Sequence, residues 1–246
     1  MNEKVKLPIG IENFEEIRTE GFYYVDKTGL IKELLDNWGK VNLFTRPRRF
    51  GKSLNINMLQ YFFEYGCDSR LFEDLEISKE TAYCEKYMGK FPVISVTLKG
   101  VIARDFNGAK AMLRMIIGNE ALRFPFLLKS PKLSEQEKKK YRNLTEISAN
   151  GHRGFSMSDD ELTDSLRTLC SLLHKHYDQK PILLIDEYDV PLDKARQAGY
   201  YDKMITLIRG LFGQALKTNT SLYFAVLTGC LRIAKESIFT GLNNFN

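Results

Sequence analysis

The residues with the clearest chemistry are Gly51, Lys52 and Ser53, which match the last three positions of a phosphate-binding loop. The usual pattern is G-x-x-x-x-G-K-[ST], and this chain has Arg46 where that pattern has its first glycine. Backbone N–H groups at a helix start carry partial positive charge and have no internal partner, so they bind anions. We expect Lys52 to add a full charge for the outer phosphates of a nucleotide, and Ser53 a hydroxyl for Mg²⁺.

The rest of the loop is basic, and its flanks predict the setting that such a motif requires. Arg48, Arg49 and Phe50 precede the glycine, and we expect all three to contribute to nucleotide binding. The apolar run 41–44 predicts a strand before the loop, and the apolar spacing over 54–63 predicts a helix after it. A G-K-S tripeptide alone is also common in ordinary turns, so the interpretation needs support from elsewhere in the chain.

That support comes from two acidic residues far downstream. Asp186 and Glu187 follow the apolar run 182–185, which predicts a strand buried on both faces of a parallel sheet. Ligands of open α/β sheets bind at the C-terminal ends of the strands. We expect Asp186 to hold Mg²⁺ through its water shell, and Glu187 to act as the catalytic base that orients the attacking water. Strands that end in solvated acids are common, but together with the loop these residues form a Walker A and Walker B pair.

A third apolar run, 220–227, ends in Thr228. In additional-strand P-loop ATPases a polar residue at this place senses the γ-phosphate, so we expect Thr228 to assist catalysis beside Lys52 and Glu187. The alternative is a threonine that only caps its strand. Arg232 also has two interpretations: it contacts a phosphate, from this chain or from a neighbouring subunit, or it is an exposed helix residue.

These motifs belong to a larger set that spans essentially the whole chain. The set consists of Leu7–Ile11, Tyr23–Thr28, Thr45–Ser53, Ile185–Asp189, Leu227–Gly229 and Glu236–Phe245. In this combination the chain resembles the predicted AAA-ATPase-like family of bacteria and archaea. An arginine-rich loop without the first glycine is normal in that family, so the resemblance implies a functional loop despite Arg46. Members often carry a further C-terminal region that is similar to restriction-type nucleases, and we find no such region in this sequence.

The resemblance and the pattern of elements predict the same fold class. We expect a single domain, 1–246, with a three-layer α/β P-loop NTPase fold of the additional-strand (AAA/STAND-like) type. Each strand–helix–strand unit implies a crossover, hence a mostly parallel sheet with helices on both faces. Four strands are visible, one of them over 91–98. By resemblance, the fifth strand and a small helical lid would follow Asn246, so we expect the domain to be truncated before them.

Three further helical regions are predicted, two between these strands and one before the first of them. An inserted helical hairpin is expected around 103–173, with a polar break near 149–154, and a long helix over 203–217. A helix from about residue 27 to 37 precedes the first strand. In related ATPases this last region approaches the nucleotide base, so Tyr24 and Asp26 are candidates for adenine or ribose contacts. Alternatively, they cap the helix that follows them.

Composition is ordinary for a globular protein, with 43% hydrophobic and 27% charged residues, and this favours one packed α/β domain. No apolar run reaches the roughly 20 residues that cross a bilayer, and the N-terminus has no apolar signal core. The four scattered cysteines include no C-x-x-C pair, which favours reduced thiols over disulfides or a zinc site. We therefore expect a cytoplasmic protein with no membrane partner.

The net charge of +5 is concentrated in two places. Around the phosphate loop, a bound polyphosphate is a sufficient partner for the arginines. The second group, Lys138–Lys140 with Arg142, contacts nucleic acid or forms a solvated helix face. Glu135 and Glu137 lie among these lysines, and this mixture of charges favours the solvated face.

The function predicted from these residues is Mg²⁺-dependent ATP hydrolysis, with in-line attack of water on the γ-phosphate. We expect metal binding at Ser53 and Asp186, and the nucleotide-binding set to be Arg48, Arg49, Phe50, Gly51, Lys52, Ser53 and Asp186. ATP is preferred over GTP by the resemblance alone. One alternative is a nucleotide-dependent switch or interaction module with little turnover, and a weaker one is an accessory role in nucleic-acid processing. Glu187 favours hydrolysis, because a pure binder needs no base there. Protein partners and self-association stay open.

Overall fold

The computed structural model describes residues 6–37, 39–148 and 154–230. The strands are β1 (Val41–Thr45), β2 (Val93–Thr97), β3 (Ile182–Asp186) and β4 (Ala225–Gly229). The α-helices are α1 (Phe14–Thr19), α2 (Gly29–Asp36), α3 (Lys52–Phe63), α4 (Thr81–Tyr87), α5 (Phe106–Ala121), α6 (Glu135–Thr145), α7 (Asp159–Tyr177), α8 (Val190–Gln197) and α9 (Tyr201–Phe212). Short helical turns are η1 (Ser69–Phe72), η2 (Glu76–Lys79), η3 (Pro125–Lys129) and η4 (Gly213–Lys217).

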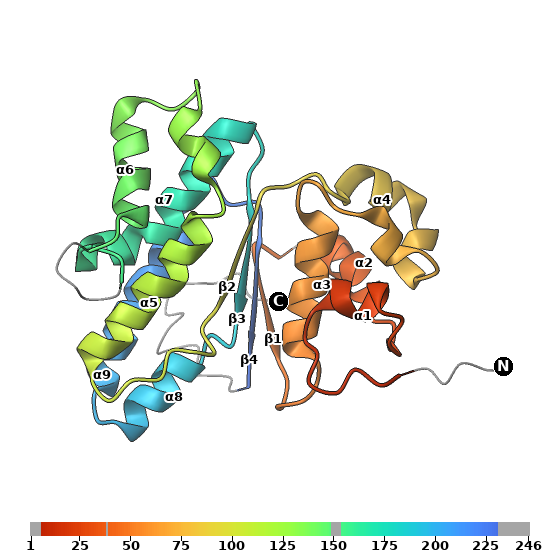
Figure 1. The fold of residues 1–246 in the computed structure, drawn as a ribbon, viewed down its shortest axis with the longest axis horizontal. Coiled ribbons are helices and arrows are strands. Elements are labelled where there is room, and N and C mark those ends of the chain that lie inside the picture. Colours follow the sequence, from red (N-terminus) through yellow and green to blue (C-terminus); the bar gives the residue numbers. More distant parts are fainter. Residues whose placement is uncertain (1–5, 38, 149–153, 231–246) are drawn as a thin grey trace.

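The four strands form one parallel sheet in the order β1-β4-β3-β2 (Figure 1). Parallel neighbours need crossover connections, and helices supply them on both faces. Helices α1 to α4 lie on one side of the sheet, and α5 to α9 lie on the other. Because β4 separates β1 from β3, the predicted loop strand and acidic strand flank the threonine strand. This three-layer α/β arrangement confirms the predicted fold class.

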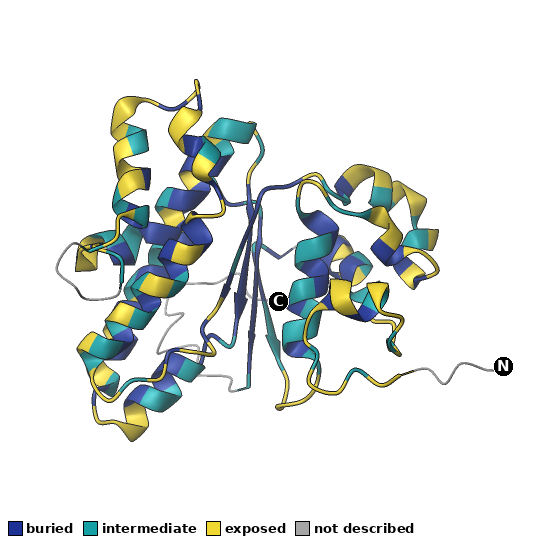
Figure 2. Cartoon of the chain, in the orientation of Figure 1, coloured by how far each residue is buried: buried dark blue, intermediate teal, exposed yellow. Residues whose placement is uncertain are grey.

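The sheet is buried on both faces because its side chains alternate between two cores. Leu183 and Ile185 of β3 belong to the core shared with α5, α7 and α9, whereas Ile182 and Leu184 belong to the core shared with α2 and α3. All five residues of β3 are buried (Figure 2). A strand covered on both faces needs apolar residues at every position, which explains the uninterrupted run before Asp186.

The helix that carries the loop residues is fixed by aromatic packing. Phe63 of α3 meets Phe224 edge-on, with ring centroids 5.6 Å apart, and Phe62 meets Phe72 in the same way at 5.4 Å. Edge-to-face pairs of this kind stabilise a core beyond the area that they bury. The C-terminal end of α3 is thereby held against the sheet near the start of β4.

Several element boundaries differ from the prediction. Strand β4 covers 225–229, not the whole apolar run from 220, and α9 ends at Phe212, where the wider turn η4 replaces regular helix. In the described part of the chain between β2 and β3 lie the α-helices α5, α6 and α7, and Ser158 and Glu161 form a capping box at the start of α7. That this region is an insertion, and that a fifth strand and lid follow Asn246, stay predictions. Within the described residues, no helix combines the length and apolarity needed to cross a bilayer.

Candidate functional site

The predicted residues converge because three strands end at the same edge of the sheet. In the register of the sheet, Thr45 pairs with Gly229 and Phe44 with Thr228. Arg46 continues this ladder by one residue, its N–H donating to Gly229 O at 3.1 Å. The loop after β1, the acids after β3 and the threonine of β4 are therefore neighbours in space, although they are far apart in sequence.

The loop makes its tight turn with two residues in the left-handed region. Gly51 has φ of 75°, which glycine adopts without steric cost. Arg49 has φ of 68°, a conformation that costs a residue with a side chain roughly 1–2 kcal/mol. Strain of this kind gathers at functional sites, where the surrounding structure holds it. Helix α3 begins directly after the turn, and its first intrahelical bond runs from Asn55 N–H to Gly51 O at 2.9 Å.

Asp186, the last residue of β3, connects this strand to β4 and to α3 by hydrogen bonds. Its Oδ2 accepts a hydrogen bond from Ser53 Oγ at 2.7 Å, and its Oδ1 accepts one from Thr228 Oγ1. Asp186 is 4% exposed and Thr228 3% exposed, so the bond between them is buried, whereas the bond to Ser53 is partly buried. The two predicted metal ligands, Ser53 and Asp186, are therefore in direct contact.

Their oxygens are of the type that Mg²⁺ prefers, since this ion binds one or two protein groups and completes its shell with phosphate and water. Among the described residues, no cluster of three or more histidine, cysteine, aspartate or glutamate side chains is placed to hold a metal ion. A Mg²⁺ ion at Ser53 and Asp186 would accordingly depend on a bound phosphate. The donor set fits that mode of binding.

Glu187 follows Asp186 directly, in a strained turn. Its φ is 52°, and it is half-buried. Burial raises the pKa of its carboxyl group above the ordinary value, and the charge of Asp186 raises it further. The turn is tied to β4 by two hydrogen bonds, from Tyr188 N–H to Thr228 O at 3.1 Å and from Cys230 N–H to Asp189 Oδ2 at 3.0 Å.

Lys52 is buried, and its ammonium group lies inside the loop. Nζ donates to Pro47 O at 3.0 Å and contacts Cys230 Sγ at 3.3 Å. The lysine charge thus occupies the concave side of the loop, next to the end of β4. Cys230 was not predicted as a neighbour of Lys52, and its position two residues after Thr228 is the only signal that could have indicated it.

A cavity of about 730 Å³, here called the phosphate-side cavity, opens beside this cluster. Its walls include six of the predicted site residues: Arg48, Arg49, Gly51, Lys52, Ser53 and Glu187. Residues outside the predicted site complete it: Pro8, Gly10, Ile11, Glu12, Leu54, Lys99, Ile102, Val190 and Lys194. The structure thus gathers most of the predicted site around one opening, and it adds the segment before α1 as a wall.

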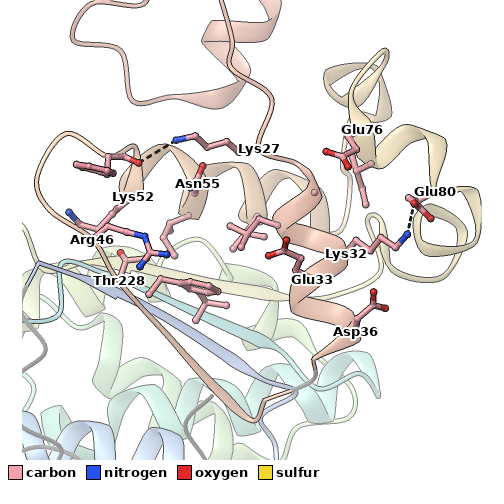
Figure 3. Close-up of a pocket in the computed structure, with 18 residues that line it drawn as sticks. Lys27, Lys32, Glu33, Asp36, Arg46, Lys52, Asn55, Glu76, Glu80 and Thr228 are labelled. Carbon is pink, nitrogen blue, oxygen red and sulfur yellow. Dashed lines mark hydrogen bonds and ion pairs between the residues drawn. The ribbon is translucent and has the colours of Figure 1, made fainter.

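A second cavity of about 630 Å³, here called the inter-helix cavity, lies between α2, α3 and β1 (Figure 3). Arg46 and Phe50 line it, so the loop separates the two cavities, and Lys52 contributes to both. Glu33 of α2 and Asn55 of α3 are among its polar residues. Its apolar walls are Leu30, Phe44, Ile56, Leu59, Ile77 and Val226.

Tyr24 and Asp26, in the segment before α2, have structural partners. Asp26 Oδ1 accepts hydrogen bonds from Thr28 N–H at 2.8 Å and from Thr28 Oγ1 at 2.7 Å, and its Oδ2 accepts one from Glu76 N–H at 2.7 Å. These bonds hold the turn that precedes α2, whereas α2 itself has no side-chain cap hydrogen bond at its N-cap residue, Thr28. The ring of Tyr24 packs edge-on against Phe14, at 5.3 Å between centroids. Arg232 lies outside the described residues.

The second basic group, on α6, is interleaved with acids. Lys138 Nζ lies 2.9 Å from Glu135 Oε1, and Arg142 lies 3.4 Å from the other oxygen of the same carboxylate. Glu137 forms an ion pair with Lys175 of α7 at 2.8 Å. These pairs make the surface one of mixed charge, and the predicted nucleic-acid contact stays a prediction.

Gly229, the last residue of β4, packs closely against the turn that follows Glu187, and this packing can be tested. A Cβ at Gly229 would lie 2.5 Å from Tyr188 Cε1 and 2.7 Å from Asp189 Oδ1, closer than real Cβ contacts. We expect Gly229→Ala to lower the free energy of unfolding by about 1–3 kcal/mol, the usual cost of overpacking. Urea unfolding followed by circular dichroism measures it. Gly213→Ala is the control, because nothing lies within 4 Å of its Cβ position. Equal midpoints for the two variants would contradict this close packing.

Comparison with known proteins places this chain in a family. The model of a family described as predicted AAA-ATPase matches residues 8–239. A curated protein of Azotobacter chroococcum mcd 1, named "Uncharacterized protein in vnfD 5'region", is 26% identical over 245 residues. The match covers 98% of this chain and 40% of that protein, so the chain spans well under half of the relative's length. No solved structure matches. Because the family model covers nearly the whole chain, the chain belongs to the predicted AAA-ATPase family.

Proposed function

We propose that this chain binds ATP at the loop between β1 and α3 and hydrolyses it with Mg²⁺. The observation that carries the proposal is the hydrogen-bonded cluster of Ser53, Asp186 and Thr228 at the N-terminus of α3. A hydroxyl at the helix start, a buried carboxylate and a second hydroxyl from the strand between them suit a metal-bound polyphosphate better than they suit any purely structural role. Membership of the family supports nucleotide binding in general.

Binding would use charges that already face the phosphate-side cavity. Lys52 is held by only one carbonyl and one thiol, and a phosphate oxygen is a stronger partner for an ammonium group than either. Arg48 and Arg49 line the same cavity and add two charges that are never lost at physiological pH. The N-terminus of α3 adds backbone N–H groups and the positive end of the helix dipole.

Hydrolysis requires that the terminal phosphate and a water molecule meet in line. Bound Mg²⁺, held by Ser53 and Asp186, would neutralise charge on the outer phosphates. Thr228 orients the Asp186 carboxylate through its hydrogen bond and presents a hydroxyl at the same place. Glu187 projects from a strained turn into the cavity that contains Lys52 and Ser53, where its carboxylate can accept a hydrogen bond from the attacking water.

The inter-helix cavity is suited to the nucleoside end of ATP. Apolar and polar side chains share its walls, a mixture that suits a base and a ribose, and Glu33 and Asn55 supply an acceptor and an amide. The cavity meets the phosphate loop at Arg46, Phe50 and Lys52, so one ligand can reach both. The base contacts that we propose are thus on α2 and α3, not at Tyr24 and Asp26.

Filling the inter-helix cavity should weaken binding of the nucleoside and spare the polyphosphate. We expect Leu30→Trp to raise the Kd for ATP about tenfold or more, because the ring occupies the space of the base. Binding of inorganic tripolyphosphate should not change. Calorimetric titration with each ligand measures both, and Leu128→Trp, at an exposed position on η3, is the control. If Leu30→Trp and the wild type bound ATP with equal affinity, the nucleoside would not bind in the inter-helix cavity.

The proposal as a whole is tested by titrating the wild-type chain with ATP in the presence of Mg²⁺ and then of a chelator. We expect saturable binding near one ATP per chain, weaker without the metal. Absence of saturable binding in both conditions would overturn the proposal. A switch with little turnover would use the same site, and it differs from an ATPase in the behaviour of Glu187, which is taken up below.

A further inference from the structure

Lys99 is a basic residue that the motifs do not indicate, and it leaves the sheet beside the predicted metal ligand. In the register of β2 and β3, Thr97 pairs with Asp186, and Leu98 N–H donates to Asp186 O at 2.9 Å. Lys99 follows at once. It lines the phosphate-side cavity and also a smaller cavity of about 360 Å³ that contains Ser53 and Asp186. A cation therefore stands at the junction of the two cavities.

The partner of Lys99 in this structure is Glu12, in the segment before α1. Nζ lies 3.0 Å from both carboxylate oxygens. The two side chains are 53% and 59% exposed, so water screens the pair and it contributes little to stability. Glu12 lines the phosphate-side cavity as well. An ion pair of this kind can exchange one anion for another at small cost.

The surroundings of Lys99 are acidic, which keeps it charged. The hydrogen bond to Glu12 is the largest cause that raises the pKa of Lys99, and the charges of Glu187 and Asp186 raise it further. Lys52, by contrast, is held inside the phosphate loop, where its Nζ donates to Pro47 O. The two lysines thus approach the cavity from different elements, α3 and the end of β2.

We propose that Lys99 binds the terminal phosphate of ATP, and that it does so by exchanging the Glu12 carboxylate for a phosphate oxygen. The inference rests on the proposed function and adds a residue to it. It also gives the site a readout, because loss of the ion pair releases residues 8–12 from the end of β2. ADP lacks the phosphate that Lys99 would bind, so it leaves the ion pair in place.

The released segment has a fixed end, which limits the change to the residues before α1. Phe14 N–H donates to Asn57 Oδ1 at 2.6 Å, and Tyr61 Oη donates to Glu15 Oε2 at 2.8 Å, so α1 stays attached to α3. Pro8, Gly10 and Ile11 line the phosphate-side cavity next to Glu12. Opening of this short segment would expose the cavity wall without unfolding the helix behind it.

The test compares the affinities for ATP and ADP, both with Mg²⁺. Lys99→Ala should raise the Kd for ATP about 10- to 100-fold, the range for a hydrogen bond to a charged group, and leave the Kd for ADP within about twofold. Glu12→Gln should leave ATP binding equal or a few-fold tighter, since a competing anion is gone. Lys175→Ala, which removes a similarly exposed lysine from its pair with Glu137, is the matched control and should change neither.

Hydrogen exchange supplies a readout that a structural role of Lys99 would not move. In the wild type, ATP but not ADP should speed amide exchange over residues 9–12. In the Lys99→Ala variant, amide exchange in the same segment should be fast even without nucleotide. Unchanged ATP affinity of Lys99→Ala, or equal losses of affinity for ATP and ADP, would overturn the inference, and the proposed function would stand as long as Lys52→Ala still weakened ATP binding. If the wild type bound no ATP, the proposed function would fall as well.

Discussion

Lys52→Ala should lower the affinity for ATP by about 10- to 100-fold or more, the largest loss of binding that we expect from one substitution. A charge-assisted hydrogen bond to phosphate is lost, and hydrogen bonds to charged groups are worth roughly 1.5–3 kcal/mol. Lys52 is 8% exposed and its ammonium group already lies inside the loop, so binding needs an exchange of partners and no large movement. Calorimetric titration with ATP and Mg²⁺ measures the loss.

The control for this variant must separate lost binding from lost folding, because Lys52 is buried. Lys52→Arg keeps the charge and the packing of the alkyl stem but changes the head group, and we expect it to fold and to bind ATP weakly. Thermal unfolding by circular dichroism should give similar midpoints for all three proteins. ATP affinity of a folded Lys52→Ala chain equal to that of the wild type would show that the phosphate loop is wrongly assigned.

Glu187→Gln should keep ATP affinity within about threefold and lower the turnover number by about 10²- to 10⁴-fold, the usual contribution of a positioned general base. Glutamine has the same shape and tolerates the same backbone, so the strained turn at φ of 52° should persist. What it loses is the negative charge that orients and polarises water. Phosphate release at saturating ATP, measured beside a binding titration, separates the two effects.

Glu85→Gln, at an exposed position on α4, is the control for this substitution and should leave turnover unchanged. If Glu187→Gln turned over ATP as fast as the wild type, Glu187 would not be the catalytic base. That result would favour the alternative function, a nucleotide-dependent switch in which hydrolysis is incidental.

The contacts that the sequence could predict are those that local motifs and sheet topology determine together. Ser53 and Asp186 are 133 residues apart, yet their contact at 2.7 Å follows from two motifs and the rule that parallel strands end at one edge. The order of the strands adds Thr228 between them. Asp186 and Thr228 stand at the ends of apolar runs, and Ser53 stands in the loop motif that follows another apolar run. These patterns can be recognised in the sequence alone.

Other contacts could not be predicted, because no motif in the sequence indicates them. Lys99 and Glu12 are 87 residues apart, and Lys52 and Cys230 are 178 apart, with no motif that joins either pair. Both depend on how α1 and the end of β4 pack in three dimensions. The cavities could not be predicted for the same reason, since they are spaces left between helices whose separation depends on all the side chains that they bury.

The boundaries of β4 and α9 show why local propensity was not enough. Asn219 Nδ2 donates to Ala215 O at 3.1 Å, and its Oδ1 accepts from Ser221 N–H at 3.0 Å. These side-chain bonds offer the backbone an alternative to the sheet ladder. The strand therefore begins at Ala225, several residues after the start of the apolar run.

The most direct test of the central claim is steady-state release of inorganic phosphate from ATP by the wild-type chain and by Lys52→Ala, purified in parallel. We predict Mg²⁺-dependent release by the wild type that is proportional to protein concentration, and release at the background level by Lys52→Ala. Equal release by the two proteins would trace the activity to a contaminant or to another site. ATP binding by the wild type without any phosphate release would contradict the ATPase and leave only the switch.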